Sequence, residues 1–128
     1  MDANELVEHL RAGFLSGRGI DPALLADDVV IEWPFAAPGR PRRIEGRAAF
    51  EVMAGAQRAA MPFRLDEFHL DTLHRTEEPE VTVLEYRLGG LIAGDRRSAA
   101  FVSVIRQRDG LIAEWREYQD TLAMTFGS

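Results

Sequence analysis

Residues 108–120, RDGLIAEWREYQD, decide the fold that this sequence predicts. Asp109-Gly110 is the strongest short signal for a β-hairpin, because the central residues of a two-residue turn favour positive φ. The flanking segments, about 97–107 and 111–119, are predicted to be the paired strands. Residues 111–120 carry two aromatic and four charged side chains. Successive side chains of a strand point to opposite faces of a sheet, so only half of them can face the interior.

Outward from this hairpin, the sequence predicts helices in its first half and strands in its second half. Asp2 and Glu5 form a capping signal for a helix over residues 3–16, where apolar residues recur with helical period. Asp21-Pro22 predicts a short helix that stops at Asp27. The other predicted elements are a strand in 29–35, a brief strand in 42–46, a helix from Arg47 to Met61 that ends before Pro62, and strands over about 63–73 and 80–88.

This order of elements predicts an α+β fold, in which helices pack on one face of a strongly curved antiparallel sheet. A chain of 128 residues, of which 46% are hydrophobic, has room for one sizeable core, so we expect a single domain over residues 1–128. A sheet wrapped round helices leaves a pocket between them, and alternate residues of each strand would line it.

The composition excludes several kinds of chemistry. The sequence contains no Lys and no Cys, which excludes lysine Schiff bases, cysteine nucleophiles, thiolate metal sites and disulfides. His69 and His74 lie five residues apart, on opposite faces of a strand, so no metal site is expected. The Gly residues match no phosphate-binding fingerprint, and we expect no cofactor.

Charge and hydropathy also limit the partners. The net charge is −6 and the fifteen Arg residues are dispersed, so nucleic acid is not an expected partner. The sequence shows neither a secretory signal nor an apolar run of membrane-spanning length, so we expect no membrane association and a cytoplasmic location.

Three stretches carry a resemblance to a known family: LADDVVIEWPF (25–35), IEGRAAF (44–50) and RDGLIAEWREYQD (108–120). With the order of elements, they resemble the SnoaL-like and ketosteroid-isomerase-like members of the nuclear transport factor 2 superfamily over nearly the whole chain. The resemblance implies a cone-shaped fold in which a curved antiparallel sheet packs on three N-terminal helices. It also implies a homodimer with one open-mouthed apolar cavity per subunit, which would take a small hydrophobic substrate or ligand.

The functional residues of these relatives are only partly matched. Where steroid isomerases have their general base, this sequence has Trp33, and the position of their oxyanion-holding carboxylic acid matches Ser103. WREYQD (115–120) is similar to a stretch of limonene epoxide hydrolases whose final Asp belongs to their water-activating apparatus. Those enzymes also use an Arg and a second Asp on the middle strand, where this sequence reads EYRL (85–88). SnoaL-like cyclases rely chiefly on one acidic residue near the end of the sheet, which is compatible with Asp120.

The alternation along the last predicted strand selects a candidate site. If Ile112 faces the helices, then Arg116, Tyr118 and Asp120 face the cavity, and Trp115 lies on the outer face, where these folds dimerise. A carboxylate in an apolar cavity is desolvated, which raises its pKa towards neutrality and lets it both take and give a proton. Tyr118 would donate a hydrogen bond to a carbonyl oxygen as negative charge develops on it.

The predicted catalytic residues are therefore Asp120, Tyr118 and His69, the last as a second acid or base. The predicted substrate-binding residues are Trp33, Arg116, Tyr86, Ser103, Phe50 and Met53. Structural alternatives stay open for some of these residues. Asp120 could serve as a cap or pair with Arg116, His69 could lie on the surface, and Trp33 could belong to the ordinary core.

These residues predict a cofactor-independent isomerase or cyclase that uses Asp120 to move protons on a hydrophobic, carbonyl-bearing small molecule, such as a polyketide-like metabolite. Epoxide hydrolysis is a second hypothesis, weakened by the missing Arg and Asp of the middle strand. A third is a ligand-binding or dimerisation module without turnover, and Trp33 in place of a base is its best support.

Overall fold

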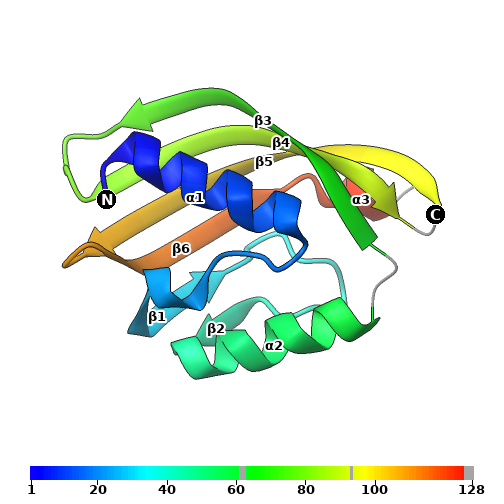
Figure 1. Cartoon of the computed structure of the whole chain (residues 1–128), viewed down its shortest axis with the longest axis horizontal. Helices are drawn as coiled ribbons and strands as arrows, with labels where there is room; N and C mark the ends of the chain where they lie inside the picture. The colour runs from blue at the N-terminus through cyan, green and yellow to red at the C-terminus, as the bar shows by residue number, and fades with distance from the viewer. Residues whose placement is uncertain (61–62, 93, 126–128) are drawn as a thin grey trace.

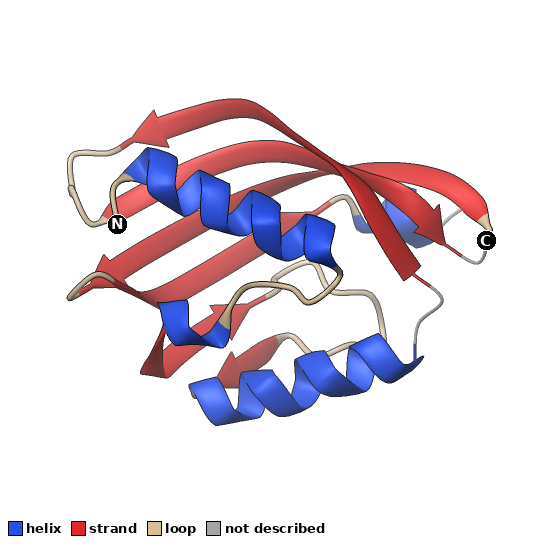
Figure 2. Cartoon of the chain, viewed as in Figure 1, coloured by secondary structure: helices blue, strands red, loops and turns tan. Residues whose placement is uncertain are grey.

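The computed structural model describes residues 1–60, 63–92 and 94–125. A curved six-stranded sheet forms one layer, and α1 crosses one face of it (Figures 1 and 2). The elements in chain order are α1 (Ala3–Ser16), η1 (Pro22–Leu24), β1 (Leu25–Glu32), β2 (Arg43–Glu45), α2 (Arg47–Ala60), β3 (Phe63–Arg75), β4 (Val81–Ile92), β5 (Asp95–Arg108), β6 (Leu111–Gln119) and α3 (Thr121–Thr125). The predicted α+β fold with a curved sheet is confirmed.

The strands of the sheet lie in the order β2-β1-β6-β5-β4-β3. Strands β3 to β6 form an antiparallel meander, as the sequence predicts. Strand β1 pairs antiparallel with β2 but parallel with β6, so the sheet is not antiparallel throughout. Strand β6, the last in the sequence, therefore lies inside the sheet and joins the β1–β2 pair to the meander.

The first helix follows its capping signals. The backbone N–H of Glu5 donates to the Asp2 carboxylate at 2.8 Å, and the helix ends at Gly17, whose φ of 76° is left-handed. Leu6 and Leu10 lie on its inner face and are almost completely buried against the sheet. Burial of one such Leu side chain contributes about 1.5–3 kcal/mol. The spacing of apolar residues thus predicts which face of α1 packs on the core.

Several element boundaries differ from those predicted. The short helix after Asp21 is a 3₁₀ turn that ends at Leu24, and β1 spans Leu25–Glu32 instead of 29–35. Strand β4 continues to Ile92, beyond its predicted end at 88. Leu25 is fully buried, so the sheet recruits residues that precede the predicted strand. The C-terminal helix α3 was not predicted. Helix α2 is described as far as Ala60, and the predicted end at Met61 lies outside the described residues.

The predicted turn between β5 and β6 is confirmed. Asp109 and Gly110 have φ values of 53° and 78°, so both central residues lie in the left-handed region that a type I′ hairpin turn requires. The core lies between the sheet and the helices, and its largest fully buried side chain is Tyr86. Within the described part of the chain, no helix is long and apolar enough to cross a membrane.

Candidate functional site

Beyond Ile112, the side chains of strand β6 that face the interior are those predicted to face outward. Arg106 pairs with Glu114 while Gln107 pairs with Ile112, so Ala113 is an extra residue on β6 and forms a β-bulge. Ile112 faces the interior, as expected, but the bulge shifts the alternation by one residue beyond it. Trp115 is consequently 5% exposed and packs in the core. The prediction that Trp115 lies on the outer face is wrong.

Four interior side chains form a continuous hydrogen-bonded chain. The indole N–H of Trp115 donates to Ser103 Oγ at 2.9 Å, Ser103 Oγ lies 2.7 Å from Tyr86 Oη, and Tyr86 Oη donates to Glu117 Oε2 at 2.9 Å. Tyr86 and Ser103 are completely buried, whereas Glu117 is only partly buried. The chain therefore begins in the closed core and ends on a residue that is only partly buried.

The Tyr86 ring is held by aromatic neighbours on both sides. Its centroid lies 5.4 Å from that of Phe68 and 5.6 Å from that of Phe101, and both pairs are stacked. Offset aromatic pairs contribute about 0.5–1.5 kcal/mol beyond the area they bury. Because the ring has little freedom to move, the position of its hydroxyl oxygen is fixed relative to Glu117.

The surroundings of Glu117 shift its protonation equilibrium. Burial raises the pKa of the Glu117 carboxyl above its usual value, and hydrogen bonds from Tyr86 and Trp33 offset part of that rise. Burial and the adjacent Glu117 carboxylate raise the pKa of the Tyr86 phenol well above its ordinary value. Tyr86 therefore stays protonated as a donor, while Glu117 exchanges a proton at a pH closer to neutrality than an exposed Glu does.

Several predicted substrate-binding residues do lie on the interior side. Trp33 is partly buried, packs against the core and acts on Glu117 as a hydrogen-bond donor. Met53 of α2 also packs against the core and keeps some exposure, while Phe50 is 8% exposed. Tyr86 and Ser103 face the interior too, but their complete burial prevents direct contact with a bound molecule.

The predicted catalytic acid, Asp120, lies outside the interior. Asp120 is exposed, its side chain accepts a hydrogen bond from the backbone N–H of Ala123 at 3.0 Å, and it caps α3. The prediction that Asp120 faces an apolar cavity is therefore wrong, and the alternative that Asp120 serves as a helix cap is confirmed. Tyr118 and Arg116 share the outer face with it, and the Tyr118 ring meets the ring of Phe35 edge-on at 5.4 Å.

His69 also lies on the surface rather than in the interior. Its side chain is 74% exposed and its Nε2 lies 3.4 Å from a carboxylate oxygen of Asp71. The middle-strand residues Glu85 and Arg87 point outward as well, towards His74 and Asp71 respectively. Among residues 1–60, 63–92 and 94–125, no group of three or more metal-ligating side chains is placed to hold a metal ion.

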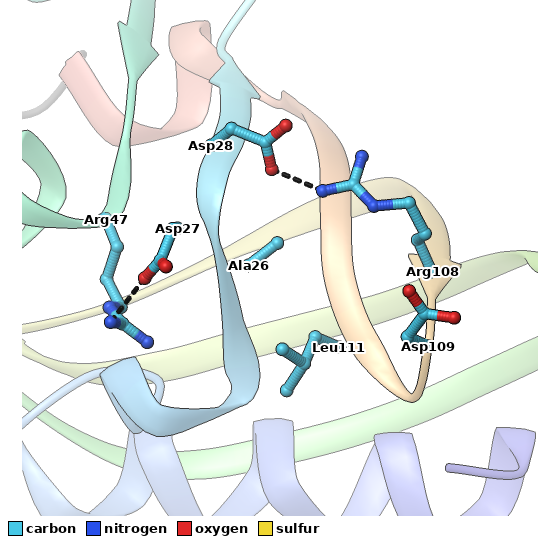
Figure 3. A pocket seen from close by; sticks show the side chains of 7 residues that line it. All are labelled: Ala26, Asp27, Asp28, Arg47, Arg108, Asp109 and Leu111. Carbon is cyan, nitrogen blue, oxygen red and sulfur yellow. Dashed lines mark hydrogen bonds and ion pairs between the residues drawn. The ribbon is translucent and has the colours of Figure 1, made fainter.

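A surface pocket of about 310 Å³ lies between β1 and the β5–β6 turn (Figure 3). Both Arg side chains in it form ion pairs, Arg47 with Asp27 and Arg108 with Asp28. The remaining lining residues are Ala26, Asp109 and Leu111. None of the members of the interior hydrogen-bonded chain lines this pocket, and both of its cations are already paired with carboxylates, so we take the interior carboxyl group as the candidate site.

Glu117 is the residue that reasoning from the sequence missed. It shares a face with Trp115, which the regular alternation from Ile112 assigns to the outer surface. The signal that could have found it is the pair Ile112–Ala113, two consecutive residues that are both buried. Two neighbouring apolar residues in an otherwise alternating strand are compatible with a bulge.

These features, a curved sheet with an acidic side chain on its interior face, are compared with those of known protein families. The chain belongs to the SnoaL-like domain family, whose model matches residues 4–115. The uncharacterized protein YesE of Bacillus subtilis is 29% identical over 100 residues, which are 77% of this chain and 67% of YesE. This chain therefore spans about two thirds of that relative's length.

Solved structures show the same fold. A crystal structure of a candidate isomerase from Bacillus subtilis matches with a TM-score of 0.80 and 26% identity, covering 94% of this chain and 86% of that one. An LEH-like epoxide hydrolase from M. tuberculosis matches with a TM-score of 0.67 and 22% identity, covering 94% of this chain and 84% of the hydrolase.

Proposed function

We propose that the protein is a cofactor-independent acid/base enzyme, an isomerase or cyclase, in which Glu117 moves a proton on a hydrophobic, carbonyl-bearing small molecule. The observation that carries the proposal is a partly buried Glu side chain on the interior face of the sheet, whose carboxyl group accepts a hydrogen bond at 2.9 Å from a fully buried phenol. Its raised pKa suits a group that must both accept and return a proton near neutral pH.

The chemistry balances without an oxidant or a reductant. Glu117 takes a proton from the carbon next to the carbonyl, and the C–H electron pair forms the C=C bond of an enolate. In an isomerisation, Glu117 returns the same proton to another carbon. In a cyclisation, the enolate carbon attacks a second carbonyl carbon of the same molecule, a C–C bond forms, and the proton goes to the new alkoxide.

The neighbours of Glu117 have different parts in this scheme. Trp33 is partly exposed, so its indole can form an apolar wall against the substrate while its N–H donates to the carboxylate. Once Glu117 has taken a proton, it needs these hydrogen bonds less, and the Trp33 N–H becomes available to the oxygen on which charge develops. Tyr86 acts only through Glu117, because it is fully buried.

The comparisons support the isomerase class more than a particular reaction. The B. subtilis structure described as a candidate isomerase shares the fold and 26% of the aligned sequence. A polyketide-like or other secondary metabolite is our proposed substrate class, on the family resemblance and on the apolar side chains that pack beside Trp33 in the core.

Proton abstraction can be measured before the natural substrate is identified. We would incubate the protein in D₂O with a panel of hydrophobic 1,3-diketones and β,γ-unsaturated ketones and follow loss of the α-proton signal by NMR. We expect exchange faster than in buffer alone, and we expect Glu117→Gln to reduce the enzymatic rate by about 10²-fold or more.

Asp120→Asn is the matched control, because it alters an acidic residue on the outer side of the sheet and leaves an oxygen that can cap α3. We expect it to keep the exchange rate. Equal rates for the wild type and Glu117→Gln on every active compound would remove Glu117 from the chemistry. An absence of exchange with the whole panel, together with tight binding of an unaltered metabolite, would favour a binding module.

Epoxide hydrolysis is a weaker candidate on the same carboxyl group. A partly exposed carboxylate can take a proton from water as well as from carbon. The Arg and second acid that such enzymes use on the middle strand have no interior counterpart here, because Glu85 and Arg87 point outward. Incubation with terpene epoxides in ¹⁸O-labelled water distinguishes the two, since hydrolysis places the label in a diol.

A further inference from the structure

In the interior hydrogen-bonded chain, every donor points the same way along the chain, and Trp115 at the buried end sets that direction. The chain runs from Trp115 through Ser103 and Tyr86 to Glu117 over contacts of 2.9, 2.7 and 2.9 Å. An indole N–H can only donate, whereas a hydroxyl both donates and accepts and an ionised carboxylate only accepts. Trp115 and ionised Glu117 therefore fix the two ends of the chain.

The protons between these ends then have one consistent arrangement. Ser103 Oγ accepts from Trp115, and the Ser103 proton goes to Tyr86 Oη, which sends its own proton to Glu117. In the reverse arrangement, Tyr86 would donate to Ser103. The Ser103 oxygen would then receive two protons, and its own proton would point at neither of its partners. Leaving a buried donor unpaired is unfavourable.

This direction has a consequence for Glu117 when it is protonated. Tyr86 still presents its proton to Oε2, and Trp33 is an N–H donor that cannot accept. Neither neighbour can receive the acidic hydrogen of Glu117. We therefore place the hydrogen on the carboxyl oxygen to which Tyr86 does not donate, where a bound molecule would accept it.

We infer that Ser103 and Trp115 are positioning residues, which hold the Tyr86 hydroxyl as a donor so that Glu117 presents its acidic hydrogen away from the core. The inference deepens the proposed function and rests on Glu117 being its acid and base. Both residues act through Tyr86 without touching substrate, since Ser103 is completely buried and Trp115 is 5% exposed.

The test follows the titration of Glu117 in the free protein by NMR of ¹³C-labelled Glu carboxyl groups. The signal lost in Glu117→Gln assigns the resonance. We expect Ser103→Ala to raise the pKa of Glu117, because a Tyr86 hydroxyl that no longer accepts a hydrogen bond donates more weakly. We expect Trp115→Phe to raise it too, because Ser103 no longer receives the indole N–H and can accept the Tyr86 proton in place of Glu117. We expect neither change to have a further effect in a Tyr86→Phe background.

Thr82→Val is the matched control, since Thr82 is a buried residue with a hydroxyl group at the start of β4, the strand that carries Tyr86. Thr82→Val should leave the pKa of Glu117 unchanged. If Ser103→Ala does not fold, Trp115→Phe tests the same inference, because it removes the indole N–H that donates to Ser103. An unchanged Glu117 titration in whichever of the two variants folds, or an equal rise in Thr82→Val, overturns the inference.

The outcomes for the inference and for the proposed function are separable. A shifted Glu117 titration without α-proton exchange leaves the positioning role intact and removes the proposed function. α-Proton exchange that depends on Glu117, together with an unshifted Glu117 titration, supports the proposed function and removes the positioning role of Ser103 and Trp115.

Discussion

The position of one carboxyl group relative to the sheet separates Glu117 from the eleven other Glu residues of the chain. Glu114, three residues earlier on the same strand, is exposed and pairs with Arg106 at 3.2 Å. Glu117 instead lies against a fully buried phenol, and burial raises its pKa. A Glu side chain thus forms a surface ion pair at position 114 and is a candidate acid and base at position 117.

The raised pKa of Glu117 predicts how stability depends on pH. Its pKa is higher in the folded chain than in the unfolded chain, so between the two values the folded state binds more protons. The free energy of unfolding therefore falls as the pH rises through that window. Glu117→Gln cannot ionise, so its stability relative to the wild type should increase as the pH rises above the ordinary Glu pKa of about 4.3.

Urea denaturation of both proteins at several pH values measures this difference. Glu51→Gln changes an exposed Glu on α2 and serves as the control, with a difference from the wild type that stays flat over the same range. A Glu117→Gln difference that is equally flat would mean that the carboxyl group is not desolvated.

Local signals predict the elements of this fold better than they predict the orientation of one strand. The cap at Asp2 and the Asp109-Gly110 turn act within a few residues, and both are found where the sequence predicts them. The bulge at Ala113 depends on pairing with both neighbouring strands, since β1 also shifts its register against β6 between Leu25 and Val30. Within β6 the apolar pair Ile112–Ala113 is compatible with a bulge, but it does not by itself fix the register.

The same contrast explains the result for the candidate site. Trp33, Tyr86 and Ser103 were predicted from residue type and resemblance, and all three lie on the interior side. Asp120 and Tyr118 were predicted from alternation along β6, and the bulge inverts that alternation. Tyr86 and Ser103 lie on β4 and β5, which pair in regular register, and both face the interior. Asp120 and Tyr118 lie beyond the bulge of β6 and do not, and His69 on β3 is exposed as well.

Helix α1 offers a test of packing against intrinsic propensity. Replacing Gly by Ala inside a helix usually stabilises it by about 0.5–1 kcal/mol. A Cβ atom on Gly13 would lie 2.6 Å from the carbonyl oxygen of Gly19, whose N–H donates to Gly13 at 3.0 Å. We therefore expect Gly13→Ala to destabilise the protein by about 1–3 kcal/mol in thermal or urea denaturation. A stabilising effect would mean that the segment 17–20 moves aside without cost.

At the scale of the whole molecule, the outer face of the sheet carries a prediction about assembly. Val83, Val102 and Val104 are only partly buried there, and Tyr118 pairs in register with Val102. The family resemblance implies that such a face joins two copies. We expect light scattering to give twice the chain mass of 14.3 kDa, and Val104→Asp to give the monomer.

Thr82→Val, which changes the interior face, should keep the mass of the dimer and is the control for that experiment. A monomeric wild type at micromolar concentration would contradict the assignment of this face. It would leave the hydrogen bonds from Tyr86 and Trp33 to Glu117 in place, because these two residues belong to the same chain as Glu117.

The place of β6 between β1 and β5 determines when the sheet can close. The β1–β2 pair reaches the meander only through this strand, so the sheet stays open until Leu111–Gln119 has been synthesised and has paired on both sides. The β1–β6 pairing joins Leu25 to Ile112, and pairing between residues so far apart in the sequence slows folding. Because β6 carries Glu117, the proposed acid and base reaches its sheltered position in the step that closes the sheet.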